Sequence, residues 1–293
     1  MTDQARRGST KVLVLGATGM LGHAVMRLLG QSPGFSTVGS VRSAAAVHLL
    51  PADIRDKVLP GVDVEDTHAL TQVVERAEPA VVINCVGLVK QLMGESDHLA
   101  ALTINSVFPH RLARVCAQAG ARLVHFSTDC VFSGDRGMYR EDDLPDARDL
   151  YGLTKYLGEV DYPGAITLRT SIIGHELVGA HGLVEWFLAQ SGSVKGYTRA
   201  IFSGLTTLEL SLVIRDYVLP RNQMRGVYHV AARPISKHDL LKLVAETYGK
   251  SIEIIPDDHL RLDRSLDGSR FTAETGYRAP EWPSLIKRMR EFQ

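Results

Sequence analysis

The sequence predicts an α/β fold, in which a parallel sheet is covered by helices on both of its faces. In the first half of the chain, continuously apolar runs typical of buried strands alternate with amphipathic stretches typical of helices. A glycine-rich segment at residues 16–22 lies between the first such strand and the first such helix. With 293 residues, the chain is long enough for one large domain and a smaller second one.

The expected elements follow one another in a regular order in the first half. Strands are expected over 12–15, 35–41, 58–62, 80–86 and 122–126, and helices around 24–29, 43–55, 66–77 and 99–119. In the less regular second half, strands are expected over 166–169, 227–230 and 252–255, and helices over 150–160, 182–190, 207–219, 236–248 and 284–292. Two helix ends have a clear cause, because Pro79 cannot continue a helix and Gly120 suits the position that follows one.

Composition and charge exclude several classes of protein. The 33 Lys and Arg residues balance the 33 Asp and Glu residues, whereas a nucleic-acid binder needs a positive excess. The longest apolar run, 80–89, is interrupted by Asn84 and is too short to cross a membrane. Three cysteines without CxxC spacing indicate reduced thiols and a cytoplasmic location. The histidines are scattered without zinc-site spacing, so no metal is expected.

The pattern Gly16-x-x-Gly19-x-x-Gly22 predicts a dinucleotide site. Gly16 allows a tight turn, Gly19 lets the backbone approach a pyrophosphate, and Gly22 lets the helix pack closely on the strand. The start of that helix offers N–H donors and a positive dipole end to the phosphates. The alternative is an ordinary glycine-rich turn. The cofactor contacts expected in this turn are Gly16, Thr18, Gly19, Met20 and Leu21.

These features together predict a Rossmann-type doubly wound domain over residues 1–170. Residues 171–293 are expected to form a smaller, mainly substrate-binding subdomain, with some segments returning to the Rossmann sheet. No linker rich in Pro, Gly or Ser separates the two parts. We therefore expect the subdomain to consist of excursions over the carboxyl end of the sheet.

The end of the second strand indicates which nicotinamide cofactor is bound. An acidic residue there binds the ribose 2′-hydroxyl of NAD, and an arginine accommodates the 2′-phosphate of NADP. This chain has Arg42 and no carboxylate at that point, which favours NADPH and leaves NADH as the alternative. Further cofactor contacts are expected after the third and fourth strands, at Asp63, Val64, Cys85, Val86 and Gly87.

Tyr151 and Lys155 give the sharpest chemical signal. Four residues apart on a helix, they share one face, so the ammonium is expected to stabilise the phenolate and lower the tyrosine pKa. That arrangement suits proton exchange with a hydroxyl or carbonyl group. Thr128 ends a predicted strand and brings a hydroxyl to the same edge of the sheet. The three residues are expected to be catalytic.

These residues resemble the extended short-chain dehydrogenases/reductases, and within them the dTDP-4-dehydrorhamnose reductase family. The segments STDCVFSG (127–134), 139–142, YGLTKYLGE (151–159) and LRTSIIG (168–174) carry the closer resemblance. It implies NADPH-dependent reduction of the 4-keto group of a nucleotide-linked 6-deoxysugar, for deoxysugar or polysaccharide precursor synthesis. It also implies that Tyr151 is the proton donor, that Lys155 also holds the nicotinamide ribose, and that Thr128 binds the substrate carbonyl. Asn105 would position a water molecule or contact the backbone.

The resemblance is weaker around the expected sugar pocket. Cys130 stands where the family often has a tyrosine, and IFSGLTT (201–207) replaces the usual Asp-Gln-x-Gly-x-Pro-Thr segment. The particular nucleotide and sugar therefore stay open. The expected substrate contacts are Thr128, Asp129, Trp186, Tyr197, Arg199 and Thr207.

Two other functions are weighed against the reductase. One is an epimerase or 4,6-dehydratase with tightly held NAD, but Cys130 occupies the place of the second carboxylate that dehydratases of this kind carry. The other is a non-catalytic, nucleotide-binding regulatory subunit, which has no need of Thr128, Tyr151 and Lys155 together. A homodimer is also considered, in which the 99–119 helix and the Tyr151 helix pair across a two-fold axis.

Overall fold

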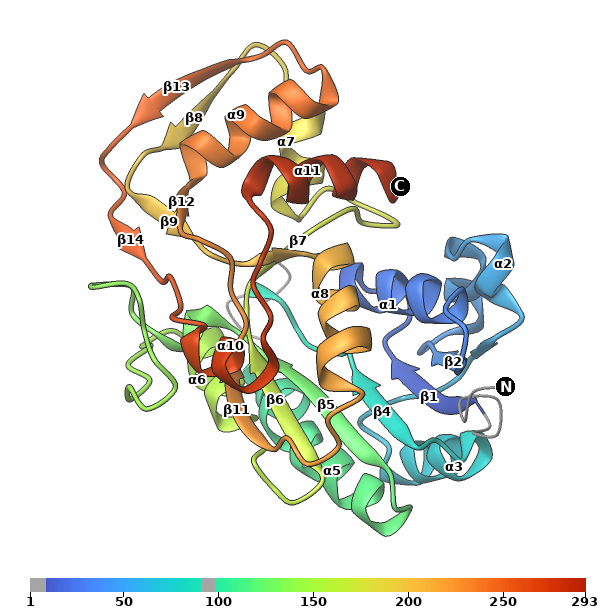
Figure 1. Cartoon of the computed structure of the whole chain (residues 1–293). Coiled ribbons are helices and arrows are strands. Elements are labelled where there is room, and N and C mark those ends of the chain that lie inside the picture. The colour runs from blue at the N-terminus through green and yellow to red at the C-terminus, as the bar shows by residue number, and fades with distance from the viewer. Residues whose placement is uncertain (1–8, 91–97) are drawn as a thin grey trace, which may run out of the picture.

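The computed structural model describes residues 9–90 and 98–293, and its centre is a seven-stranded parallel sheet (Figure 1). The strand order is β11-β6-β5-β4-β1-β2-β3, so the chain reverses direction across the sheet between β1 and β4. In open α/β sheets, ligands bind at such a reversal, outside the carboxyl ends of the strands. The predicted α/β class is confirmed. The strands are β1 (Thr10–Leu15), β2 (Phe35–Ser40), β3 (Val58–Leu59), β4 (Val81–Asn84), β5 (Arg122–Ser127), β6 (Ala165–Arg169) and β11 (Gly226–His229).

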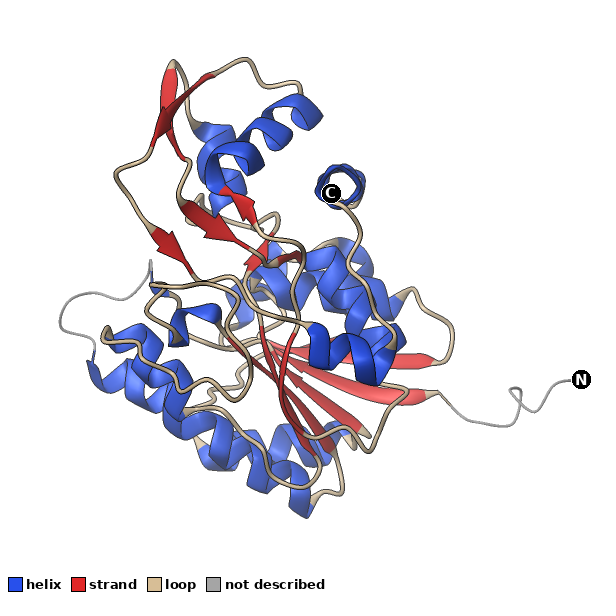
Figure 2. Ribbon diagram, turned by 60° about the vertical axis from the view of Figure 1, so that its left-hand side comes forward, coloured by secondary structure: helices blue, strands red, loops and turns tan. Residues whose placement is uncertain are grey.

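Helices cover both faces of the sheet, as Figure 2 shows. Successive side chains of β1 point to opposite faces: Val12 and Val14 join one hydrophobic core, and Leu13 and Leu15 join the other. This is why the strand is apolar at every position from Val12 to Leu15. The helical segments of the first half are α1 (Met20–Gly30), η2 (Ala44–Leu49), α2 (Ala52–Arg55), α3 (Thr67–Ala77), α4 (His98–Ala101), η4 (Leu102–Val107), α5 (Phe108–Gln118), η5 (Asp129–Val131) and α6 (Leu150–Leu157).

The second half adds small strands above the carboxyl end of the sheet and further helices, some of them above that end and others packed against the sheet (Figure 1). β11 lies apart from this layer, because it pairs with β6 at the edge of the main sheet. The small strands are β7 (Ile172–Ile173), β8 (Ser193–Tyr197), β9 (Ala200–Phe202), β10 (Leu205–Thr206), β12 (Ile235–Ser236), β13 (Glu253–Asp257) and β14 (Leu262–Asp263). The helices are α7 (Leu183–Ala189), α8 (Thr207–Val213), η6 (Ile214–Val218), α9 (Lys237–Tyr248), α10 (Ser269–Thr275) and α11 (Trp282–Glu291).

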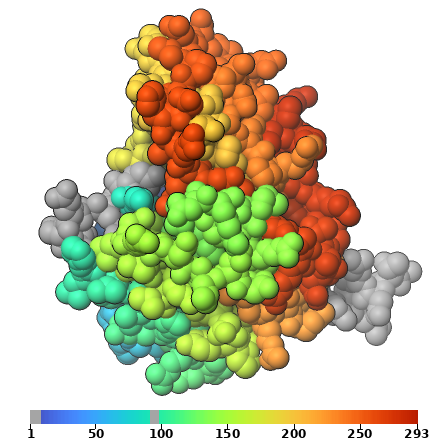
Figure 3. All heavy atoms as spheres, turned by 90° about the vertical axis from the view of Figure 1, so that its left-hand side faces the viewer, coloured from blue at the N-terminus to red at the C-terminus, as the bar shows by residue number. Residues whose placement is uncertain are grey.

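The segment around residues 132–146 lies directly below the β13–β14 region on one side of the molecule (Figure 3). The backbone N–H of Asp263 donates to the carbonyl of Gly134 at 2.8 Å. Tyr139 and Leu266 form an isolated parallel bridge in the same place. The second layer is thus fastened to the loop that follows β5, close to the carboxyl edge of the sheet.

Three expected helices differ from the structure, and the one expected over 207–219 ends in a π-helical segment, η6. The single helix expected over 43–55 is wrong: a 3₁₀ segment, η2, ends before Pro51, and α2 starts after it. Proline has no N–H to continue the helix, and it disfavours helical geometry in the residue before it. The expected 99–119 helix includes a π-helical segment, η4. Over residues 9–90 and 98–293, no helix is both long and apolar enough to cross a membrane.

Candidate active site

The glycine turn after β1 has the geometry that a dinucleotide site requires. Gly16 adopts a φ of +80°, which residues with a side chain rarely adopt. A Cβ on Gly22 would lie 2.0 Å from the carbonyl oxygen of Gly16, so only glycine lets α1 approach the turn. No side chain caps the start of α1, and its first N–H groups are open to a phosphate. These residues fit a nicotinamide dinucleotide. The side chain of Leu21 is buried in the core, so its backbone N–H is the group that this residue can offer to a phosphate.

The ends of β2, β3 and β4 carry the other expected cofactor contacts. Arg42 lies two residues after the end of β2 and is exposed to solvent. Asp63 is exposed after β3 and accepts a hydrogen bond from the N–H of Glu65 at 3.0 Å. At the end of β4, a Cβ placed on Gly87 would lie 3.8 Å from Nζ of Lys155. The β4 edge and Lys155 therefore face each other; Val64, Cys85 and Val86 are half-buried beside these strand ends.

Thr128 and helix α6 meet at the end of β5. Thr128 caps η5: its Oγ1 accepts from the N–H of Cys130 at 3.1 Å and donates to Oδ1 of Asp129 at 3.1 Å. Asp149 caps α6, with Oδ1 accepting from the N–H of Gly152 at 3.0 Å. The cap sets the start of the helix that carries Tyr151 and Lys155. The structure thus brings Thr128, Asp129, Tyr151 and Lys155 together.

Burial controls the ionisation of this group. Burial raises the pKa of Tyr151, and a hydrogen bond with the Thr128 side chain opposes the rise only in part. The expected lowering of the tyrosine pKa is therefore wrong for this structure, because burial outweighs the opposing contributions. Nζ of Lys155 instead donates to the carbonyl oxygen of Phe126 at 2.7 Å, and burial lowers the lysine pKa to about 8. The phenol of Tyr151 therefore stays protonated over the physiological range.

Asn105 joins the β4 edge to α6. Its Oδ1 accepts from the N–H of Leu88 at 2.9 Å, and its Nδ2 donates to the carbonyl of Leu88 at 3.0 Å. The same Nδ2 lies 3.4 Å from Oγ1 of Thr154 on α6. Of the two expected roles for Asn105, the structure has the backbone contact. This side chain comes from the π-helical segment η4, a type of turn often found at functional sites.

Arg264, which the sequence analysis did not single out, reaches this edge from the second half of the chain. Its Nε donates to the carbonyl of Phe132 at 2.8 Å, and Nη1 lies 3.5 Å from Sγ of Cys130. A separation of 134 residues left no local signal for this contact. Burial raises the pKa of the Cys130 thiol to about 12, so the thiol is protonated and unreactive.

The remaining expected substrate contacts lie on the second layer. Trp186 is 37% exposed on α7, Tyr197 ends β8, and Thr207 is buried at the start of α8. Arg199 lines a cavity of about 480 Å³ together with Gly134, Asp135, Arg261 and Asp263, among others. A larger cavity of about 790 Å³ lies at the opposite, amino-terminal edge of the sheet, away from the predicted site. Among the described residues, one group could offer three metal ligands, at residues 257–259 after β13.

Comparisons with known proteins find relatives that match nearly the whole chain. A probable low-salt glycan biosynthesis reductase from Haloferax volcanii is 30% identical, over 91% of this chain and 93% of its own. Methionine adenosyltransferase 2 subunit beta from Mus musculus is 33% identical, over 97% and 91% of the two chains. A dTDP-4-dehydrorhamnose reductase from Bacillus anthracis, solved in complex with NADP, has a TM-score of 0.81 at 21% identity, with 97% of this chain and 100% of its own covered.

A model of a protein family also matches more than half of the chain. The model described as "RmlD substrate binding domain" matches residues 10–198. A dTDP-4-dehydrorhamnose reductase from Streptomyces griseus is 36% identical over 148 residues, which is 50% of this chain and 43% of that one. The resemblance inferred from the sequence motifs is therefore confirmed, and the chain belongs to the RmlD substrate-binding-domain family.

Proposed function

We propose that the protein is an NADPH-dependent reductase of the 4-keto group of a nucleotide-linked 6-deoxysugar. The observation that carries the proposal is the meeting of Thr128, Tyr151 and Lys155 beside the carboxyl ends of β4 and β5. Two of the sequence relatives named above are reductases, and the solved structure named above is a dTDP-4-dehydrorhamnose reductase. The product serves the synthesis of deoxysugars or polysaccharide precursors.

In the proposed reaction, each of the three side chains acts on the sugar carbonyl or on its neighbours. The reduced nicotinamide, when bound, supplies the hydride to the carbonyl carbon. Tyr151 donates its phenolic proton to the oxygen that becomes the alcohol, and the hydroxyl of Thr128 stabilises the charge on that oxygen. Lys155 holds the nicotinamide ribose, and its positive charge favours the tyrosinate that remains after proton transfer.

The cofactor lies along the turn 16–22 and the ends of β2 to β4 in this proposal. The open N–H groups of α1 bind the pyrophosphate, and the exposed Arg42 binds the 2′-phosphate of NADPH. In the same proposal, the adenosine and nicotinamide ends contact residues that follow β3 and β4: Asp63, Val64, Cys85, Val86 and Gly87. Asp129, Trp186, Tyr197, Arg199 and Thr207 are proposed to contact the substrate, within a second part of the chain that mainly binds the sugar nucleotide.

A cytoplasmic homodimer completes the proposal. Leu99, Leu102, Leu153 and Leu157 are large apolar side chains that stay exposed on the neighbouring segments α4, η4 and α6. A second copy of the chain that packed against them would bury this apolar surface.

A second candidate is a non-catalytic subunit, and one observation favours it. Five vertebrate proteins named methionine adenosyltransferase 2 subunit beta match over 88% or more of this chain. The retained Thr128, Tyr151 and Lys155 favour the reductase, because a silent subunit has no need of them. A 4,6-dehydratase is disfavoured further, because the Cys130 thiol is protonated and cannot act as the second carboxylate.

Absorbance of the reduced cofactor tests the proposal directly. The purified chain is mixed with NADPH or NADH and a panel of dTDP-, UDP- and GDP-linked 4-keto-6-deoxysugars. Rapid oxidation with one of them is expected and names the nucleotide. Oxidation with none, together with tightly bound NAD in the purified protein, would favour the epimerase; oxidation with none and only loosely bound cofactor would favour the subunit.

A further inference from the structure

A row of buried polar side chains crosses the carboxyl ends of three neighbouring strands beside Lys155. Ser127 of β5 is paired in register with Arg169 of β6, and Arg169 is paired with His229 of β11. All three are buried. Buried charges require partners, so the contacts of Arg169 decide what this row can do.

Glu159, which follows α6, supplies the anion for this row. Its Oε1 accepts from Nε of Arg169 and from Oγ of Ser127, both at 2.7 Å. Its Oε2 accepts from Nη2 of Arg169, also at 2.7 Å, which makes the ion pair bidentate. The side chains of the pair are only 4% and 6% exposed. Such a pair is rigid and screened little by salt.

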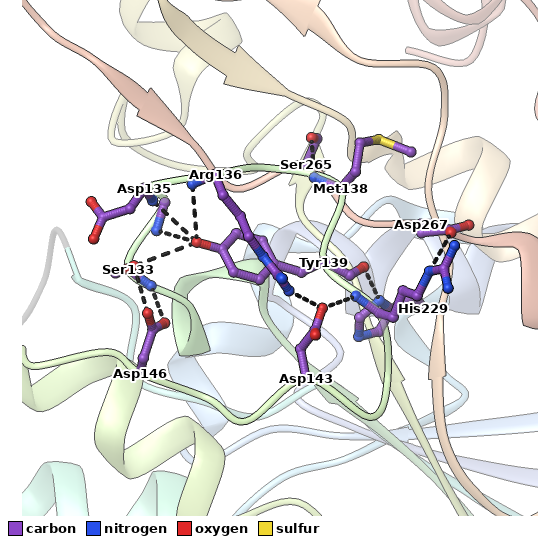
Figure 4. A network of polar contacts seen from close by, with 12 residues as sticks. Ser133, Asp135, Arg136, Met138, Tyr139, Asp143, Asp146, His229, Ser265 and Asp267 are labelled. Atoms are coloured by element: carbon purple, nitrogen blue, oxygen red, sulfur yellow. Dashed lines mark hydrogen bonds and ion pairs between the residues drawn. The ribbon is translucent and has the colours of Figure 1, made fainter.

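His229 adds no charge to the row. Its Nδ1 lies 2.9 Å from the carbonyl oxygen of Tyr139, which can only accept, so Nδ1 carries the proton. Its Nε2 then accepts from Nη1 of Arg169 at 3.2 Å. Burial, and next the charge of Arg169, lower the pKa of His229 to about 3. In Figure 4 the His229 ring lies against the loop that contains Tyr139. The Tyr139 hydroxyl stabilises this loop by accepting from the N–H groups of Gly134 and Asp135.

Lys155 lies next to this row on the same strand end. Its ammonium binds the carbonyl of Phe126, and the carboxylate of Glu159 binds the hydroxyl of the following residue, Ser127. The charge of Lys155 also acts on His125 of β5, and Tyr151 lies one turn before Lys155 on α6. Burial, then the charge of Lys155, lower the pKa of His125 well below its usual value, and burial raises that of Tyr151, so both are neutral. Glu159 is the group that opposes the loss of the lysine proton.

We propose that Glu159 is a positioning residue for Lys155: Arg169 and Ser127 fix its carboxylate one residue along β5 from the carbonyl that binds the ammonium, so that its negative charge stabilises the cation there. The role of that ammonium in reduction rests on the proposed function. Without the carboxylate, the buried ammonium of Lys155 would lose the negative charge that opposes its deprotonation, and the buried guanidinium of Arg169 would lose its partner. Since a guanidinium does not lose its proton in proteins, Lys155 would.

NMR of protein carrying ¹³C at the lysine Cε measures this charge directly, and the Lys155→Met variant assigns the Lys155 signal. In the wild-type chain the pKa of Lys155 is expected at about 8. In Glu159→Gln we expect it lower by about one unit or more. The matched control is Glu281→Gln, which breaks an exposed ion pair with Arg233 and should leave Lys155 unchanged. An unchanged pKa in a folded Glu159→Gln protein would overturn the proposal.

Two further variants keep the test decisive if Glu159→Gln does not fold. Arg169→Met leaves the carboxylate without its guanidinium, so the pKa of Lys155 should rise above the wild-type value. Glu159→Gln combined with Arg169→Met removes both charges and should give a pKa between those of the single variants. Equal values of the Lys155 pKa in wild type and Arg169→Met would contradict the proposal.

Turnover separates this inference from the proposed function. In Glu159→Gln, the decline of kcat/KM at high pH should begin at a lower pH, because the lysine pKa is lower. Glu159→Asp keeps a carboxylate and should shift the decline part of the way back toward the wild-type pH. A chain in which Lys155 responds as expected but no 4-ketosugar is reduced would contradict the proposed function alone. If the chain reduces a 4-ketosugar but the pKa of Lys155 is the same in wild type and Glu159→Gln, only the inference is contradicted.

Discussion

Gly152 lies against the carbonyl of Cys130: a Cβ on this glycine would stand 2.3 Å from that oxygen and 2.5 Å from Cβ of Ala147. The start of α6 is therefore in direct contact with the turn that carries Thr128. This contact sets the distance between the hydroxyl of Thr128 and the phenol of Tyr151, which are 23 positions apart in the sequence.

Replacement of Gly152 by alanine should displace α6 from this turn. Because catalysis depends on alignment of the reacting groups, we expect kcat to fall by about 100-fold while NADPH still binds. Gly30→Ala is the control, since its Cβ would meet only Nζ of Lys57 at 3.7 Å. Steady-state kinetics and cofactor fluorescence report the two effects. Normal kcat in a folded Gly152→Ala protein would show that this spacing does not matter.

Tyr151→Phe removes the proton donor and leaves the shape of the ring. We expect about a 100-fold to 10,000-fold loss of kcat, in the range that a positioned general acid contributes. NADPH affinity should change little, because the phenol is not expected to bind the phosphates. Turnover near the wild-type value would mean that another group donates the proton.

The pH profile should follow Lys155. Its pKa of about 8 in the folded chain means that the ammonium is present below that pH and is lost as the pH rises through it. Since Tyr151 stays protonated over the same range, kcat/KM should be level on the acid side and decline above about pH 8. Initial rates at a series of pH values measure this. A profile that rises through this region would contradict the assignment.

Arg42→Asp should change the cofactor preference. Loss of a charge-assisted bond to the 2′-phosphate costs about 1.5–3 kcal/mol, so we expect NADPH affinity to fall by about 10-fold to 100-fold and NADH to be favoured. Arg76→Asp, on the exposed side of α3, controls for the change in net charge. If the ratio of NADPH to NADH use is the same in both variants, Arg42 does not touch the 2′-phosphate.

The sequence predicted the elements whose patterns are long and regular. The strands of the main sheet and the helices α3 and α9 were expected within a few residues of their observed bounds. β9, β12 and β14 were missed, because strands of two or three residues carry too little alternation to be recognised. They form through tertiary pairing with one another.

The candidate site was predictable where it depends on neighbouring residues. The glycine turn and the Tyr151–Lys155 pair are local patterns, and the structure brings them to one edge of the sheet. Arg264 and the bidentate partner of Arg169 were not predictable, since no local spacing links residues that meet only in the folded chain. The sign of the tyrosine pKa shift was also missed, because burial is a property of the whole fold.

The fate of the transferred hydrogen tests the central claim most directly. NADPH carrying deuterium at the transferable position of the nicotinamide is incubated with the active 4-ketosugar nucleotide, and the product is analysed by NMR. The reductase account predicts one deuterium, bound to C4 of the sugar, and one oxidised cofactor for each product molecule. A product without deuterium at C4, or one formed without net oxidation of NADPH, would contradict it.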